Sequence, residues 1–208
     1  MNKPTIFDVD GTLIHTRMEY FYESVRKVLV ELGGNFSTEK VDLFVRGSKH
    51  TSRDRIIVEE FGVDYKEFIE LWRADCGRFN VAKKYKSVYP DAKPVLDELL
   101  TKGVRMAVVT DAHPHICYPQ LGHFIGSGYF SEIISTQEVK NMRNKPAPDG
   151  LIECMRRMKL SDACYVGDSE SDIVAAQRAG IESIWIDRRE HTIDIKADRT
   201  IKTLYELL

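Results

Sequence analysis

The sequence predicts an α/β protein with a doubly wound parallel sheet and an inserted all-helical domain. The second half of the chain alternates short apolar runs of strand length with helices of about ten residues, which favours parallel strands joined by right-handed crossovers. Residues 15–87 instead show helical spacing of apolar residues throughout. We therefore expect an α/β core formed by residues 1–14 and 88–208, and a helical cap formed by residues 15–87.

The composition narrows the class of protein. The 208 residues carry a net charge of -2 and have a pI near 6.3, so no domain-wide basic excess exists. This argues against a large electrostatic contact with nucleic acid or a membrane, and we expect neither as a partner. No run of about 18 apolar residues and no basic, apolar leader is present, so we expect a cytoplasmic protein. We expect it to be a monomer or a homodimer. The cysteines are expected to be structural thiols rather than zinc ligands or disulfides; they are Cys76, Cys117, Cys154 and Cys164.

The first element is a short buried strand within Thr5–Leu13 that runs into two aspartates, Asp8 and Asp10. Gly11 permits a sharp turn where the strand should stop. Two carboxylates this close repel each other unless a cation or a proton lies between them, so the pair indicates a site rather than a core. An Asp-Gly hairpin turn is the alternative, but no second strand is expected after Leu13 because the next run has helical spacing.

The insert is expected to be entirely helical. One helix should contain Tyr20 to Leu32 and end at Gly33-Gly34, a second should end at Gly62, and a third should run from Tyr65 to about Asn80. No strand is expected between residues 15 and 87.

The alternating region begins near Tyr89, with a helix that carries Val95 to Leu100 and ends at Gly103. The order that follows is strand, helix, strand, helix, strand, helix, strand and a closing helix. The expected strands are Arg105–Thr110, Glu132–Ser135, Ala163–Gly167 and Glu182–Ile186; the expected helices are Ile116–Phe124, Ala147–Met158, Asp172–Ala179 and Thr203–Leu207.

Polar residues recur where these strands end. Thr110 ends one strand and Asp168 follows another, while Asp172 falls in the first turn of the next helix and Lys145 in a loop leading into a helix. In parallel sheets, ligands bind beyond the carboxyl ends of the strands, so these side chains should meet Asp8 at one edge. Taken singly, each has a structural explanation, such as a strand-end cap, a solvated lysine or a helix N-cap.

Together they suit the chemistry of a phosphate monoester. Aspartates without histidine or cysteine favour Mg²⁺. One carboxylate can attack phosphorus while Lys145 offsets negative charge, and Asp10 can hold a proton for the leaving oxygen and later take one from water. The hydroxyls of Thr12 and Thr110 can donate to the non-bridging phosphate oxygens.

Four segments resemble, in order, the motifs of the haloacid dehalogenase superfamily. They are Asp8-Val9-Asp10-Gly11-Thr12, Val108-Val109-Thr110, Lys145-Pro146-Ala147-Pro148-Asp149 and Val166-Gly167-Asp168-Ser169-Glu170-Ser171-Asp172.

The resemblance implies a Rossmann-like core and a role for each motif residue. It makes Asp8 the nucleophile and Asp10 the general acid/base. Thr110 and Lys145 bind phosphate. The Mg²⁺ ligands are Asp8, Asp10 through its carbonyl, and Asp168, with Asp172 supporting the metal or Lys145. The helical insert resembles the cap of the branch that contains phosphoglycolate phosphatases and β-phosphoglucomutases.

The sequence departs from that branch at Asp111, where its members usually carry asparagine. An added negative charge beside the phosphate pocket predicts an altered substrate preference. Asp10 itself argues against the dehalogenases and the phosphonatases, which lack this second aspartate.

Basic residues gather in the insert between Arg46 and Arg55, and include Lys49. A solvated helix face is the ordinary explanation. The functional hypothesis is that Arg46 and Lys49 bind an acidic substrate, such as one with a carboxylate beside its phosphate.

The predicted function is a Mg²⁺-dependent phosphatase that acts on a small phosphorylated metabolite, phosphoglycolate-like or a sugar phosphate, through an aspartyl phosphate. A β-phosphoglucomutase-like phosphomutase would use the same residues and is the first alternative. A non-catalytic binding module on the same fold is the second.

Overall fold

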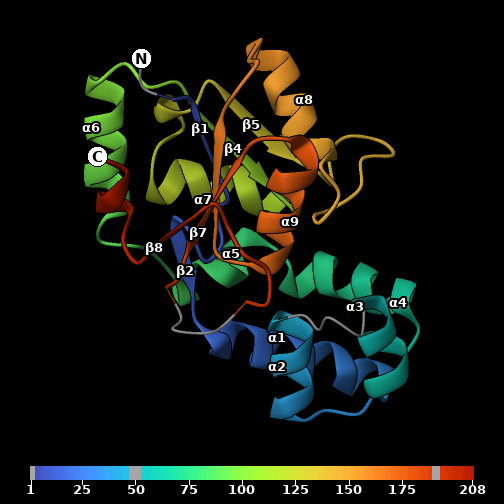
Figure 1. The fold of residues 1–208 in the computed structure, drawn as a ribbon. Helices are drawn as coiled ribbons and strands as arrows, with labels where there is room; N and C mark the ends of the chain where they lie inside the picture. Colours follow the sequence, from blue (N-terminus) through green and yellow to red (C-terminus); the bar gives the residue numbers. More distant parts are fainter. Residues whose placement is uncertain (1–2, 47–52, 189–192) are drawn as a thin grey trace. The chain divides into compact units, whose positions relative to one another are not determined.

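The computed structural model describes residues 3–46, 53–188 and 193–208 (Figure 1). The chain forms two compact units: Met1–His15 with Ser87–Leu208, here called the core unit, and Thr16–Lys86, here called the helical unit. No helix in the described ranges is long and apolar enough to cross a membrane.

The core unit contains a six-stranded sheet in the order β5-β4-β1-β6-β7-β8, and all of its neighbouring strands pair in parallel. The α/β fold with a parallel sheet and a helical insertion is therefore confirmed. The strands are β1 (Thr5–Phe7), β4 (Met106–Thr110), β5 (Glu132–Ser135), β6 (Cys164–Gly167), β7 (Glu182–Ile186) and β8 (Arg199–Ile201).

Helices cover both faces of this sheet (Figure 1). Alternate strand residues point to opposite faces, so Phe7 and Val108 pack on one side, against α6 (Ala92–Thr101) and α7 (Pro114–Phe124). Ile6, Val109 and Tyr165 pack on the other side, against α8 (Asp149–Met158) and α9 (Glu170–Ala179). Burial on both faces explains why these strands read as continuous apolar runs.

The helical unit packs around its own apolar cluster. Phe61 stacks on Phe68 with ring centroids 5.8 Å apart, and Phe44 meets the edge of Phe68 at 6.0 Å. Its helices are α1 (Met18–Leu32), α2 (Thr38–Arg46), α3 (Arg53–Arg55), α4 (Tyr65–Leu71) and α5 (Phe79–Ala82), with π-helical turns at Ile56–Glu60 and Trp72–Cys76 and a 3-10 turn at Lys83–Tyr85.

Three sequence predictions were wrong in detail, and two elements of the core unit were not predicted. The helix expected from Tyr65 to Asn80 is interrupted by the π-helical turn and by Gly77. Two three-residue strands, β2 (Ile14–Thr16) and β3 (Lys86–Val88), pair with each other where the chain passes between the units, so a strand does follow Leu13.

The other differences lie in the core unit. The closing helix is a 3-10 turn, Leu204–Leu207. The edge strand β8 before it was not predicted, because three residues are too few to show a period. A further 3-10 turn spans Ser127–Tyr129.

Candidate active site

Three adjacent strands deliver polar residues to one edge of the sheet. Phe7 of β1 pairs with Val108 of β4 and with Val166 of β6, so the residues that follow these positions emerge side by side. Asp8 comes directly after β1, and Asp168 directly after β6. The structure thus brings together two carboxylates that lie far apart in the chain.

Asp172 joins them to form a carboxylate cluster. Oxygen atoms of Asp8, Asp168 and Asp172 lie within 4.8 Å of one another. All three residues are buried, with exposed fractions of 6%, 5% and 1%. Buried carboxylates at this separation repel strongly, and they require compensation by cations or hydrogen-bond donors.

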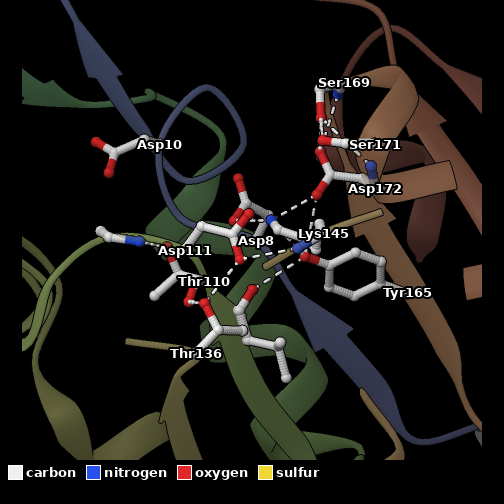
Figure 2. Close-up of polar contacts among 12 residues, drawn as sticks. Asp8, Asp10, Thr110, Asp111, Thr136, Lys145, Tyr165, Ser169, Ser171 and Asp172 are labelled. Atoms are coloured by element: carbon white, nitrogen blue, oxygen red, sulfur yellow. Dashed lines mark hydrogen bonds and ion pairs between the residues drawn. The ribbon is translucent and has the colours of Figure 1, made fainter. Parts of the chain in front are cut away.

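Lys145 supplies part of that compensation. Its Nζ donates to Asp8 Oδ1 at 2.7 Å, to Asp172 Oδ1 at 2.6 Å and to the Tyr165 hydroxyl at 3.0 Å (Figure 2). An ammonium group has three N–H donors, so all three are engaged. The Tyr165 hydroxyl in turn donates to the Val109 carbonyl at 2.9 Å, which directs a lone pair toward the lysine.

Burial and neighbouring charge set the ionisation of this cluster. Burial raises the pKa of Asp8 well above its usual range, and the Asp172 and Asp168 carboxylates act in the same direction, while Lys145 opposes them. Burial alone would lower the pKa of Lys145, but the Asp172 and Asp8 carboxylates outweigh it, so that pKa stands well above its usual range. Lys145 is therefore a permanent cation at neutral pH.

Asp172 is held by the first turn of α9. Ser169 caps that helix: its hydroxyl and backbone N–H both donate to Asp172 Oδ2, at 2.6 and 2.9 Å. Burial disfavours ionisation of Asp172, yet Lys145 and these Ser169 donors hold its pKa below the usual value. The helix N-terminus adds favourable electrostatics for the carboxylate.

Glycines make room for two of the carboxylates. Gly11 has φ +90°, and a Cβ at this position would overlap the Asp168 carboxylate. A Cβ at Gly167 would overlap the side chain of Asp172. Both positions therefore require glycine for close approach, and Gly11 also for its backbone conformation.

Asp10 lies apart from the cluster. Its side chain points away from Asp8 and Lys145 (Figure 2), and the Gln120 amide on α7 donates to Asp10 Oδ2 at 3.3 Å. Its carboxylate is not part of the Asp8, Asp168 and Asp172 group. Thr12, two residues further on, is fully buried, and its Oγ1 has no hydrogen-bond partner among the described residues.

The side chains of the predicted phosphate binders Thr110 and Asp111 form hydrogen bonds with backbone groups. Thr110 Oγ1 accepts the Ala112 N–H at 3.1 Å. Asp111 Oδ1 accepts the Lys145 N–H at 3.2 Å and the Thr136 hydroxyl at 2.9 Å (Figure 2). The Asp111 carboxylate, which we expected in the substrate pocket, here contacts the backbone of the loop that carries Lys145.

The structure does not test the two basic residues of the insert that we expect to bind substrate. Arg46 ends α2, and its side chain lies outside the described part of the protein, as does Lys49 entirely. Their binding of an acidic substrate stays a prediction.

Sequence reasoning missed Tyr165, Thr136 and Gln120. Tyr165 sits inside a buried strand, where the pattern predicts only a core residue and nothing marks its hydroxyl. Thr136 follows β5 directly, so the strand-end rule that found Thr110 and Asp168 would have found it. Gln120 is a fully buried polar residue on α7, a position that only packing reveals.

The donor set fits a divalent cation. It consists of three buried carboxylates without histidine or cysteine, which is the ligand chemistry of Mg²⁺. Burial, together with the nearby Asp172 and Asp168 carboxylates, raises the pKa of Asp8 and so disfavours its ionised form. A cation between them would relieve that repulsion and favour the ionised form of Asp8.

The cysteines take no part in the site. All four are free and buried, as expected for structural thiols.

The chain is similar to known proteins in sequence and in fold. Residues 5–186 match the sequence profile of the haloacid dehalogenase-like hydrolase family. Phosphoglycolate phosphatase from Escherichia coli is 33% identical over an alignment that covers 86% of this chain and 78% of that protein. PpaX from Caldanaerobacter subterraneus subsp. tengcongensis, which is assigned as a pyrophosphatase, is 24% identical over 98% of this chain and 91% of its own length.

Among solved structures, CbbY from Rhodobacter sphaeroides, crystallised with phosphate, superposes with a TM-score of 0.80. The match covers 100% of this chain and 96% of that one at 20% sequence identity, and it therefore supports the fold.

Proposed function

The chain belongs to the haloacid dehalogenase-like hydrolase family, and from this premise we propose that it is a Mg²⁺-dependent phosphatase of small phosphorylated metabolites, with Asp8 as the nucleophile. The observation that carries the proposal is the pairing of Lys145 Nζ with Asp8 Oδ1 at 2.7 Å beside the carboxylates of Asp168 and Asp172. A nucleophile, a fixed cation and an oxygen donor set for a metal are the three parts that phosphoryl transfer needs.

Lys145 has two tasks in this proposal. It holds one oxygen of the Asp8 carboxylate, which restricts the rotation of the side chain and orients it for attack. It also places a permanent positive charge where the phosphate oxygens gather negative charge in the transition state.

The reaction proceeds in two displacements. A carboxylate oxygen of Asp8 forms a bond to phosphorus as the bond to the leaving oxygen breaks, and Asp10 gives that oxygen a proton. Water then attacks phosphorus, Asp10 takes its proton, and the bond between Asp8 and phosphorus breaks to release inorganic phosphate. Asp10 points away from Asp8 here, so this role requires its side chain to leave Gln120 and turn toward the substrate (Figure 2).

The carboxylates of Asp8 and Asp168 would hold the metal, with Asp172 beside them. When bound, Mg²⁺ offsets the negative charge of the phosphate and lowers its repulsion of the Asp8 carboxylate. Asp172 serves mainly to fix Lys145, since its Oδ1 is engaged by Nζ at 2.6 Å.

The relatives and the basic residues of the insert both bear on the substrate class. We favour a phosphate monoester that carries a second acidic group, such as phosphoglycolate, over a neutral sugar phosphate, because Arg46 and Lys49 are basic. Replacing either residue with alanine should then raise KM for an acidic phosphate more than KM for a neutral aryl phosphate. Equal changes in the two KM values would exclude the idea.

Phosphate release by the purified protein tests the function. The panel consists of phosphoglycolate, sugar phosphates, pyrophosphate and a neutral aryl phosphate, each with Mg²⁺ and with a chelator. We expect Mg²⁺-dependent release that falls by a factor on the order of 1,000 or more in Asp8→Asn. The matched control is Asp162→Asn, an exposed aspartate of the core unit that should keep wild-type turnover.

Unchanged turnover in Asp8→Asn would refute the mechanism. Conversion of a sugar phosphate to its isomer without net phosphate release would identify a mutase instead. Absence of turnover on the whole panel would favour a binding module.

A further inference from the structure

Arg188 and Asp91 form a buried ion pair next to residues 8–14, which we call the catalytic loop. Arg188, just after β7, donates through both terminal nitrogens to the Asp91 carboxylate, at 2.9 and 3.1 Å. The two side chains are only 7% and 8% exposed. Nothing in the proposed reaction uses this pair.

The third guanidinium nitrogen of Arg188, Nε, contacts the catalytic loop. Its Nε donates to the Thr12 carbonyl at 3.0 Å. Next to it, the Tyr89 N–H donates to the Leu13 carbonyl at 3.0 Å, and the Arg188 guanidinium lies 3.8 Å from the centre of the Tyr89 ring. Two consecutive carbonyls of the loop therefore accept hydrogen bonds, one from Arg188 and the other from Tyr89, on whose ring Arg188 stacks.

The Asp91 side chain binds Arg188 instead of capping its own helix. It occupies the N-cap position of α6, where aspartate usually accepts hydrogen bonds from its own helix, but its side chain makes no such bond. Its carboxylate instead accepts from Arg188 and from the Leu204 N–H, the latter at 2.8 Å. The pair thus joins the catalytic loop, the start of α6 and the C-terminal 3-10 turn.

Stability alone does not account for such a pair. Removing two charges from water is costly, and a well-packed apolar pair of similar volume is often as stable. An apolar side chain, however, cannot donate to a carbonyl. The rigid fork of arginine can satisfy the Asp91 carboxylate and the Thr12 carbonyl at once.

We infer that Arg188, held by Asp91 and Tyr89, is a positioning residue that fixes the loop carrying Asp8 and Asp10 in its reactive geometry. The expected effect on kcat rests on the proposed phosphatase function. The expected effect on the order of the loop does not. The amides of Gly11, Thr12, Leu13 and Ile14 form hydrogen bonds inside the loop, which make its order measurable without any substrate.

The main test variant is Arg188→Met with Asp91→Asn, which removes the ion pair and the bond to Thr12 without leaving a buried unpaired charge. The amide oxygen that this variant introduces at position 91 can still accept from the Leu204 N–H. The matched control is Arg156→Met with Glu153→Gln, which removes the ion pairs that Glu153 forms with Arg156 and Arg157 at the surface of α8. Arg188→Lys keeps the charge but offers a single ammonium in place of the fork.

Two measurements are made well below the Tm of every variant. Aryl phosphate turnover should show kcat lowered about tenfold in the main variant, with a much smaller change in KM, partial recovery in Arg188→Lys and no change in the control. Hydrogen exchange followed by mass spectrometry should show faster exchange in the peptide covering residues 8–14 and unaltered exchange in β4.

Unchanged kcat together with unchanged hydrogen exchange in residues 8–14 would overturn the inference. Hydrogen exchange that is accelerated equally in residues 8–14 and in β4 would also overturn it, because that result indicates general destabilisation. If the wild-type protein turns over no phosphate ester, the proposed function fails, and hydrogen exchange decides the role of Arg188 by itself.

Discussion

The hydroxyl of Tyr165 lies 3.0 Å from Nζ of Lys145 and completes the set of three acceptors around that ammonium. The same hydroxyl donates to the Val109 carbonyl of the neighbouring strand β4. Lys145 is thereby tied to the sheet itself as well as to the two carboxylates that it neutralises. The position of the Lys145 ammonium group is therefore fixed by buried residues of the sheet as well as by the loop that carries Lys145.

Tyr165→Phe should therefore affect both stability and turnover. It leaves one N–H of Lys145 and the Val109 carbonyl without their partner, which should destabilise the protein by about 1–3 kcal/mol in urea unfolding. We expect kcat to fall about tenfold because the cation is less well fixed. Tyr205→Phe is the control, since Tyr205 is 52% exposed. Equal effects of the two variants would contradict the role assigned to Tyr165.

Gly11→Ala should disrupt the site through contact as well as strain. The φ of +90° disfavours alanine, and its Cβ would overlap the Asp168 carboxylate. Gly103→Ala is the matched control, because Gly103 also has a positive φ, but a Cβ there would have no described neighbour within 4 Å. We expect a cost of about 1 kcal/mol for Gly103→Ala and at least about 2 kcal/mol more for Gly11→Ala, measured by thermal or urea unfolding.

Asp172 should contribute stability that depends on pH. Its folded-state pKa lies below the usual value, so its contribution is present above the unfolded-state pKa of about 4 and is lost as the pH falls through the folded-state value. Asp172→Asn should thus reduce the free energy of unfolding on the order of 3 kcal/mol at pH 7. The difference from wild type should shrink steadily below about pH 4. A difference that stays constant down to about pH 3 would rule out this linkage.

Mg²⁺ should stabilise the protein by binding to the carboxylate cluster. A ligand at about 100 times its Kd adds roughly 2.7 kcal/mol to the free energy of unfolding, which raises Tm. Asp168→Asn should lose most of this Tm shift, whereas Asp162→Asn should keep it. Thermal scans with MgCl₂ and with KCl of equal ionic strength separate site binding from screening. The same shift in both salts would argue against a metal site.

The cysteines should be unreactive in the folded protein. All four are buried, and burial raises the pKa of Cys154 to about 12, which keeps that thiol protonated at neutral pH. A thiol-specific chromogenic reagent should find no fast-reacting group in the native state and all four after unfolding. Rapid labelling of the native protein would show that one of them is accessible.

Much of the architecture was predictable from local pattern. Apolar runs such as Met106–Thr110 lie on a sheet covered on both faces, so their burial is visible in the sequence itself. The short strands β2 and β8 were not predictable, because each has three residues and only one of them is buried. The break after Leu71 was missed for another reason: a π-helical turn keeps a nearly helical spacing of apolar residues.

Period, turn residues and motif spacing are local properties of the chain. They were enough to predict the parallel sheet, the residues at its strand ends and the family to which the chain belongs. The strand-end rule did predict that Lys145 would meet Asp8, 137 positions away along the chain. Nothing in the sequence indicated that Tyr165 would bind the same ammonium group, or that Arg188 would reach Thr12 across 176 positions. These partners became known only from the folded chain, because they depend on how side chains pack between the strands, and such packing leaves no pattern along the sequence.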